Sequence, residues 1–452
     1  MLKTRIVILL ALLMLTAWGV QAQDQTIAEV VAGNEDFSTL ASLVEAAGLA
    51  DALNSEGLTV FAPTNEAFAA LPPSVVAYLT DPAHVDTLTR VLNYHVVPQE
   101  MMSADVTTGE PATAEGNALA VVADEMGVTV NGAHVVQADV DASNGVIHAI
   151  DQVLIPPFEL PEVDPLAVTG NIIAAGSSTV FPVTERMADL FNQDGFSGTI
   201  TVDSVGTGAG FERFCVNAET DISNASRPIN QEEIDACLAN NREPLPFYIG
   251  IDALAIAVSA ENDFVDSLTL EQLAQVFSGG NSITWADVNP DWPAEPIQLF
   301  SPGTDSGTFD YFVEEVFDEN EEPILNAPGI QLSEDDNVLV QGVLGSPYAI
   351  GYFGYAYYQE NQDILRAVAI EGVVPSEETG SSGAYPLSRP LYIYSDATIM
   401  QEKPQVAAFI NYYISNVEAQ LGPAEGQIGY IPVPENIKHL NALVWLAATG
   451  GM

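Results

Sequence analysis

The chain has 452 residues, of which 62 are Asp or Glu and only 11 are Lys or Arg, so its formal net charge is −51. Such an acidic balance repels nucleic acids and anionic membrane surfaces, and it argues against both as partners. Hydrophobic residues make up 48% of the sequence, which argues against a disordered acidic chain and supplies apolar material for two or more folded domains.

Residues 1–22 have the pattern of a secretory signal peptide. Lys3 and Arg5 precede an apolar run from residue 6 to residue 18, and small residues up to Ala22 offer a cleavage site. The run is too short to span a bilayer comfortably, and no second long apolar stretch follows it. Cleavage removes two basic residues and no acidic ones, so nine basic side chains then face 62 acidic ones, a net charge of −53. We therefore expect a secreted or periplasmic protein, cleaved near Ala22, with no transmembrane segment in its mature chain.

Residues 25–157 are expected to form a first domain that mixes helices and strands. Thr26 and Glu29 form a capping box before a helix, and residues 57–68 have the pattern of a strand, a proline turn and a new helix start. Further strands are expected within residues 118–122, 128–130 and 144–154. Residues 60–68 and the Tyr94-His95 pair resemble the signatures of the fasciclin domain family. That resemblance implies an α+β domain that contacts an extracellular or cell-surface partner.

Two histidines of this domain are candidate ligands or contacts. His95 stands at a helix end and His148 in an apolar strand. A histidine can bind a metal or a partner, but neither has a second ligand at a useful spacing. We interpret both as structural residues, and we expect neither a metal site nor a catalytic residue here.

A proline-rich linker, placed at residues 158–167, separates this domain from a second one at residues 168–452. The second domain opens with an apolar strand at residues 171–175, a hydroxyl-rich turn at 176–182 and helical spacing at 184–191. The first N–H groups of a helix lack intrahelical partners and carry partial positive charge, so they can bind an oxyanion. Ser178 and Thr179 add hydroxyl donors. Taken alone, an ordinary capped turn is the simpler explanation.

The same arrangement recurs twice further along the chain. A β-branched strand at residues 198–202 leads into a small-residue turn that contains Thr207, and a helix is expected to begin at Phe211. Residues 300–309 again lie between a strand and a helix, and they contain Ser306, Gly307 and Thr308. Three helix starts with hydroxyl donors predict a site for a tetrahedral oxyanion.

Arg227 is a candidate cation for this site. A guanidinium can bind an oxyanion through two parallel hydrogen bonds. The alternative is a surface arginine that pairs with one of the many carboxylates. Arg227 lies within the loop between Cys215 and Cys237, the only cysteines. In an exported protein an even cysteine count favours a disulfide, whereas two thiols without nearby histidines make a poor metal site.

These loops, together with residues 351–357 and 428–432, resemble the substrate-binding proteins of phosphate ABC transporters. The resemblance implies an α/β, two-lobed type II periplasmic-binding fold, with hinge crossings near residues 251–258 and 386–394. It also implies inorganic phosphate as the ligand and a transporter permease as a partner. The sequence departs from the family pattern at Arg227, where the family has an aspartate, and at Pro302, where it has an arginine. The residues expected at the site are Ser178, Thr179, Val180, Phe181, Thr207, Arg227, Asp305, Ser306, Gly307 and Thr308.

Asp305 bears on the choice of ligand. Phosphate near neutral pH carries a proton that a carboxylate can accept, whereas sulfate carries none. If Asp305 faces the cleft it favours phosphate, and if it faces solvent sulfate becomes credible; we expect the former, although Asp305 could instead hold Arg227 in place.

An enzyme is the least favoured class of function. The serines stand outside any nucleophile-elbow motif, and the five histidines have no metal spacing or evident base partner. We therefore predict an exported phosphate-binding protein that needs no cofactor and serves ABC-transporter uptake. The alternative is an extracellular adhesion or matrix protein whose binding fold is structural or senses phosphate.

Overall fold

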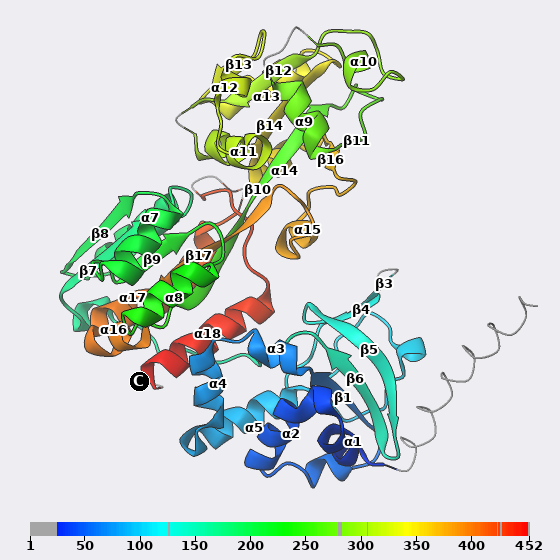
Figure 1. The fold of residues 1–452 in the computed structure, drawn as a ribbon, viewed down its shortest axis with the longest axis vertical. Helices are drawn as coiled ribbons and strands as arrows, with labels where there is room; N and C mark the ends of the chain where they lie inside the picture. Colours follow the sequence, from blue (N-terminus) through cyan, green and yellow to red (C-terminus); the bar gives the residue numbers. More distant parts are fainter. Residues whose placement is uncertain are drawn as a thin grey trace, which may run out of the picture. The chain divides into compact units, whose positions relative to one another are not determined.

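The computed structural model describes residues 25–124, 127–278, 283–304, 306–422, 424 and 427–450. They form two compact units (Figure 1). The first unit comprises the described residues up to Glu159 together with Ala442–Ala447, and the second comprises Leu160–Asn441 and the residues from Ala448 onward. The expected signal peptide and Asp305 lie outside the described residues. Among the described residues, no helix has the length and apolar character that a membrane crossing requires.

The first unit is built around a six-stranded sheet in the order β2-β1-β6-β5-β4-β3. Strand β1 is buried along its whole length and pairs in parallel with β6 and antiparallel with β2. The predicted capping box at Thr26 and Glu29 is present at the start of α1. The strands are β1 (Leu58–Pro63), β2 (Val96–Val97), β3 (Val121–Asp124), β4 (Gly127–Val130), β5 (Ala133–Ala142) and β6 (Gly145–Ile150), and the helices are α1 (Ile27–Gly33), α2 (Ser38–Ala46), α3 (Asn65–Ala69), α4 (Pro73–Thr80) and α5 (Val85–Tyr94).

The second unit has two lobes that share one sheet, in the order β13-β12-β14-β10-β17-β9-β7-β8, with β15 also paired to β10. The first lobe gathers segments from both ends of the unit: β7 (Asn171–Gly176), α6 (Phe181–Gln193), β8 (Thr199–Ser204), α7 (Thr207–Phe211), β9 (Ile222–Ala225), α8 (Gln231–Ala239), β17 (Ser388–Ser395), α16 (Ala397–Glu402) and α17 (Pro404–Asn416). A last helix, α18 (Glu435–Thr449), has its residues divided between the two units.

The second lobe is formed by the middle of the unit. Its buried core includes Trp285, Tyr311, Phe312 and Tyr352. The elements are β11 (Ser267–Leu268), α9 (Leu270–Phe277), α10 (Trp285–Val288), β12 (Gln298–Pro302), α11 (Gly307–Phe317), α12 (Glu322–Leu325), β13 (Gln331–Ser333), α13 (Asp336–Leu344), β14 (Ala349–Gly354), α14 (Tyr355–Asn361), β15 (Leu365–Ala367), β16 (Ala369–Ile370) and α15 (Glu377–Ser381).

Strand β10 (Leu245–Ser259) connects the lobes (Figure 1). Its first part pairs with β17 up to Ala253, and its second part pairs with β14 from Leu254 onward. The other crossing is at the start of β17, where Leu254 N–H donates to Leu387 O at 2.9 Å. Both crossings lie within the predicted hinge ranges, and the two-lobed fold is confirmed.

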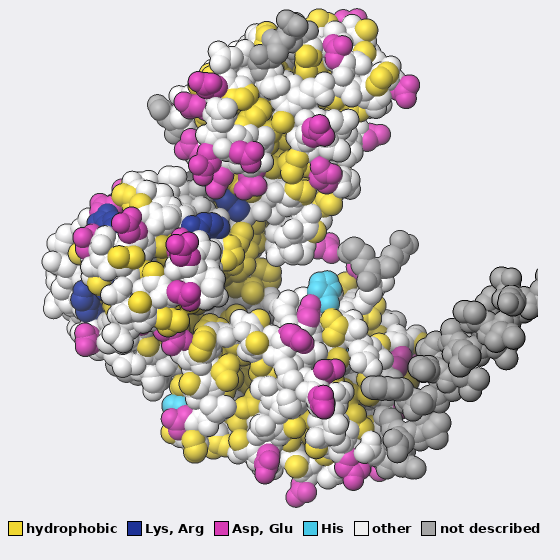
Figure 2. Space-filling view, viewed as in Figure 1, with side chains coloured by type: hydrophobic (Ala, Val, Ile, Leu, Met, Phe, Trp, Pro, Cys, Tyr) yellow, Lys and Arg dark blue, Asp and Glu magenta, His cyan; other side chains and the backbone are white. Residues whose placement is uncertain are grey.

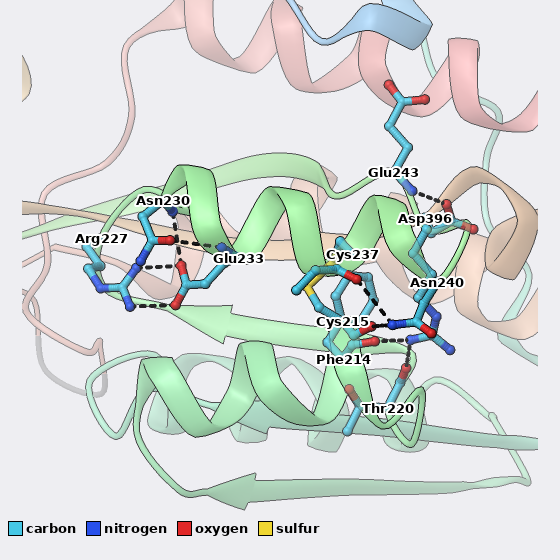
Figure 3. The surroundings of a disulfide bond; sticks show 12 residues. Phe214, Cys215, Thr220, Arg227, Asn230, Glu233, Cys237, Asn240, Glu243 and Asp396 are labelled. Atoms are coloured by element: carbon cyan, nitrogen blue, oxygen red, sulfur yellow. Dashed lines mark hydrogen bonds and ion pairs between the residues drawn. A yellow bond between two sulfur atoms is a disulfide. The ribbon is translucent and has the colours of Figure 1, made fainter.

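The predicted disulfide between Cys215 and Cys237 is confirmed (Figure 3). It joins the π-helical turn Glu212–Val216 to α8. Arg242 reinforces the same region, because its Nη1 donates to Phe214 O at 2.7 Å and to Thr220 O at 3.0 Å. In the chain-entropy model a crosslink over this separation stabilises the fold by about 3 kcal/mol.

His95 and His148 are buried in the first unit and bridge backbone segments. His95 Nδ1 donates to Val91 O at 2.7 Å, and its Nε2 accepts from Leu154 N–H at 2.9 Å. His148 Nε2 donates to Met101 O at 2.8 Å, while its Nδ1 accepts from Asp139 N–H at 3.2 Å. These contacts give both imidazoles the structural role expected for them.

The stability of the first unit should depend on pH through His95. Burial lowers the pKa of His95 to about 4, although the hydrogen bond that the ring donates to Val91 O acts to raise it. The fold therefore favours the neutral ring. The stability that neutral His95 contributes is fully present at pH values above the unfolded pKa of about 6.5. As the pH falls toward about 4, the first unit should lose up to about 3 kcal/mol.

Calorimetric unfolding of the full chain at several pH values tests this expectation. His95→Gln should show a smaller loss of Tm between about pH 6.5 and about pH 4 than the wild type, because the titrating ring is gone. Equal losses in both proteins would show that His95 does not control this pH dependence.

Candidate functional site

The hydroxyl-rich turn at residues 176–182, which we call the first donor loop, turns sharply between β7 and α6. Gly176 has φ 145°, and a Cβ there would lie 2.0 Å from Asn224 O, so this position requires glycine. Ser177 Oγ accepts from Thr179 N–H at 3.2 Å and from Val180 N–H at 3.4 Å, and Ser177 O accepts from Phe181 N–H at 3.0 Å. The N–H groups of Val180 and Phe181, expected to face a ligand, are thus engaged within the turn.

The second donor loop is the small-residue turn that contains Thr207. The helix that follows it begins earlier than predicted. Helix α7 begins at Thr207 rather than at Phe211, because Gly206, with φ 84°, turns the chain into the helix at once. Thr207 Oγ1 accepts from Ser226 N–H at 3.2 Å and lies 3.2 Å from Ser226 Oγ. The Thr207 hydroxyl is therefore held beside the residue that precedes Arg227.

Arg227 is paired with Glu233 (Figure 3). The guanidinium donates from Nη1 to Oε2 at 2.9 Å and from Nη2 to Oε1 at 2.7 Å. The hydrogen bond to Glu233 raises the pKa of Arg227 above its ordinary value. Its side chain is 42% exposed. The structure therefore shows the alternative, an arginine paired with a carboxylate, and that carboxylate belongs to Glu233.

The last predicted donor segment is the start of α11. Ser306 is its N-cap residue, and its Oγ accepts from Thr308 N–H at 3.2 Å. Gly307 is the first residue of the helix and is exposed. A Cβ at Gly307 would meet no atom within 4 Å, so open space lies beside this helix start.

A cleft of about 580 Å³ lies between the two lobes of the second unit. It brings together Ser178, Thr179, Thr207 and Arg227, whereas Val180, Phe181, Ser306, Gly307 and Thr308 are not among its lining residues. The facing wall comes from α11 and the segment after it. The cleft is lined by Ser177, Ser178, Thr179, Val205, Gly206, Thr207, Gly208, Ala209, Ser226, Arg227, Phe309, Asp310, Val313, Glu314, Glu319, Glu321 and Arg389.

The cleft is electrostatically asymmetric. Four carboxyl groups line its second-lobe wall, belonging to Asp310, Glu314, Glu319 and Glu321. Burial raises the pKa of Asp310, which Arg389 opposes. Figure 2 shows few Lys and Arg side chains on the face it presents, and those visible lie on the first lobe. An anion in the cleft therefore depends on short-range donors, since the long-range field of the protein repels it.

Arg389 is the residue of this cleft that sequence reasoning missed. Its side chain is 8% exposed. Its Nε donates to Asp252 Oδ2 at 3.2 Å, Nη1 to Glu314 Oε2 at 2.7 Å, and Nη2 to Thr179 Oγ1 at 2.7 Å. The guanidinium carbon also lies 3.7 Å from the ring centroid of Tyr311. Two features of the sequence could have identified it. Arg389 lies within the predicted hinge crossing at 386–394, and the chain has few basic residues.

Arg389 remains charged despite its burial. Loss of solvent alone would lower its pKa, but Asp252, Tyr311 and Glu314 together hold the pKa above the ordinary arginine value. The cleft thus contains one exposed and one buried guanidinium on the side of the hydroxyl donors.

Comparison with known proteins identifies both units. A family model described as the PBP superfamily domain matches residues 164–417, and the fasciclin domain model matches residues 35–156. Protein SphX of Synechocystis sp. is 39% identical over 287 residues, which cover 62% of this chain and 83% of that protein. The phosphate-binding protein PstS of Staphylococcus saprophyticus is 36% identical over 271 residues, covering 59% and 81% respectively.

A solved structure is similar to the second unit. The crystal structure of a possible phosphate binding protein from Planctomyces limnophilus is 35% identical, with a TM-score of 0.56. The match covers 62% of this chain and 99% of that one. The resemblances stated from the sequence are confirmed by these matches.

The close approach of α7 to the first donor loop predicts different effects for two neighbouring glycines. A Cβ at Gly210 would lie 2.6 Å from Gly176 Cα and 3.0 Å from Ala175 O, whereas one at Gly208 would meet nothing within 4 Å. Gly210→Ala should destabilise the second unit by about 1–3 kcal/mol through overpacking. Gly208→Ala, its matched control, should be neutral or stabilising by up to about 1 kcal/mol.

Calorimetric unfolding of both variants measures these effects. Equal Tm values for Gly210→Ala and the wild type would show that the helix and loop do not pack as closely as described.

Proposed function

This chain belongs to the PBP superfamily and carries an N-terminal fasciclin domain, and we propose that its second unit binds inorganic phosphate in the cleft between its lobes. The observation that carries the proposal is the convergence of hydroxyl donors and guanidinium groups from separate segments on one cleft. The relatives named as phosphate-binding proteins support it.

We assign the ligand contacts by loop. Ser178, Thr179 and Thr207 line the cleft from the first lobe and would donate their hydroxyls to the ligand, with Arg227 as a further contact. The N–H groups of Val180 and Phe181 would reach a ligand only by giving up bonds within their turn. The bond from Val180 N–H to Ser177 Oγ is long, at 3.4 Å, whereas that from Phe181 N–H to Ser177 O is 3.0 Å. Asp305, Ser306, Gly307 and Thr308 would join from the start of α11 when the hinge closes.

The biological role follows from the two units. We propose that the protein is exported, captures phosphate for uptake by an ABC-transporter permease, and performs no catalysis. The fasciclin domain would attach it to an extracellular or cell-surface partner. Because of that domain, a second candidate function is that of an adhesion or matrix protein, in which the cleft is structural or senses phosphate.

Titration calorimetry of the full mature chain, stripped of bound ions, tests phosphate binding. We expect saturable binding at one site. Ser178→Ala should weaken it about tenfold, because a hydrogen bond to a charged group is worth about 1.5–3 kcal/mol. Ser382→Ala, at the end of α15 and outside the cleft lining, serves as the control. Absence of heat with phosphate, sulfate and arsenate alike would favour the adhesion function.

Selectivity for phosphate over sulfate should depend on Asp305. A carboxylate that accepts the phosphate proton repels sulfate, which has none to donate. Competition titrations of Asp305→Asn should therefore show a smaller preference for phosphate than the wild type shows. An unchanged preference would remove Asp305 from the mechanism.

A further inference from the structure

Arg389 stands where three parts of the second unit meet. It lies on β17 directly opposite Asp252 of β10, at the hinge. It also contacts Thr179 in the first donor loop and Glu314 on α11 of the second lobe. We propose that Arg389 is the buried charged ligand of the oxyanion, and that the anion binds by displacing the Glu314 carboxylate from it. This inference rests on the proposed function.

The guanidinium is held ready to bind an anion. Asp252 fixes its Nε edge, and the ring of Tyr311 lies against its face. These contacts restrict the side chain, so little conformational freedom remains to be lost when a ligand binds. Further N–H groups on Nη1 and Nη2 remain beyond those that contact Glu314 and Thr179, because each of these nitrogens carries two hydrogens.

Burial makes Arg389 the stronger of the two cleft arginines. Its side chain is 8% exposed, against 42% for Arg227. A charge interaction weakens as solvent screens it, so an anion gains more from the buried guanidinium. In addition, Glu233 engages both terminal nitrogens of Arg227, and the Arg227 Nη1 also donates to Pro228 O at 3.1 Å, so fewer N–H groups remain free on these terminal nitrogens than on those of Arg389. Arg227 is therefore suited to a weaker contact at the rim.

Glu314 is the partner of Arg389 that an anion can replace. Its side chain is 49% exposed, whereas that of Asp252 is 9% exposed. A half-solvated carboxylate returns to water at little cost, but a buried one does not. Its oxygens accept from the guanidinium just as phosphate oxygens would, so the two compete for the same N–H groups. Because Asp252 stays bound, Arg389 keeps a counter-ion throughout the exchange.

Phosphate and the Glu314 carboxylate would compete for Arg389. The measured affinity for phosphate would therefore reflect how much more strongly Arg389 binds phosphate than it binds Glu314. Glu314 belongs to the second lobe and Thr179 to the first, so replacement of the carboxylate by phosphate changes how α11 is held to the hinge strand. Ligand binding would thus act directly on a contact between the lobes, the kind of contact through which a ligand shifts a hinge equilibrium.

Titration of the full chain with phosphate separates these roles. Glu314→Gln should bind phosphate about tenfold more tightly, because a competing negative charge is removed while the Arg389 guanidinium stays in place. Glu315→Gln, which removes the neighbouring carboxylate on α11 outside the cleft lining, should change the Kd by less than about threefold. An unchanged or weaker Kd in Glu314→Gln would overturn the displacement.

The arginine variants test the ligand itself. Arg389→Gln should weaken phosphate binding about 100-fold or more, and Arg227→Gln only a few-fold, because one cation is buried and the other screened. Equal effects would overturn the assignment to Arg389. Since loss of Arg389 leaves Asp252 buried without its partner, the double variant Arg389→Gln/Asp252→Asn keeps the site neutral and should show the same loss. If neither variant folds, the Glu314→Gln result decides.

These outcomes are separate from the proposed function. If the wild type binds no phosphate, the proposed function fails. If the wild type binds phosphate but the Glu314 and Arg389 variants behave like their controls, only this inference fails.

Discussion

The ion pair between Asp252 and Arg389 is the interaction on which the second unit depends most. It joins β10 to β17 at the level where both strands pass between the lobes. A buried charge is costly unless it is paired and hydrogen-bonded, so each residue requires the other. With Thr179 and Glu314 added, the same guanidinium connects the hinge, the first donor loop and α11. The residue that connects these parts is therefore also the more deeply buried of the two arginines that line the cleft.

This placement resolves the conflict between a strongly acidic chain and an anionic ligand. The long-range field of the protein opposes any anion, and salt screens it only beyond roughly 8 Å. In the proposed site, however, the buried guanidinium and the hydroxyls of Ser178 and Thr207 would act on the anion at short range. Binding then depends on a few oriented donors rather than on net charge. The acidic surface is therefore compatible with the proposed ligand.

Much of this architecture could be predicted from the sequence because it depends on local patterns. The strand, turn and helix around Ser178 and the disulfide follow from apolar spacing, small residues and cysteine count. The hinge ranges came instead from the resemblance to the transporter family. The partners of Arg227 and Arg389 could not be predicted in this way. Glu314 is 75 residues from Arg389 and Asp252 is 137, so their meeting depends on the tertiary fold. Ser177 was also not predicted. Its hydroxyl closes the turn by accepting from the N–H groups of Thr179 and Val180, and a sequence pattern does not distinguish this role from ligand binding.

A crystal structure of the full chain with arsenate, located by the anomalous scattering of arsenic, tests the central claim most directly. We predict an arsenic peak in the cleft with oxygens in hydrogen-bond contact with Arg389 and Thr207. We also predict that the Glu314 carboxylate has moved off the guanidinium. A peak beside Arg227 alone, or an intact Arg389–Glu314 pair with the anion present, would contradict this claim.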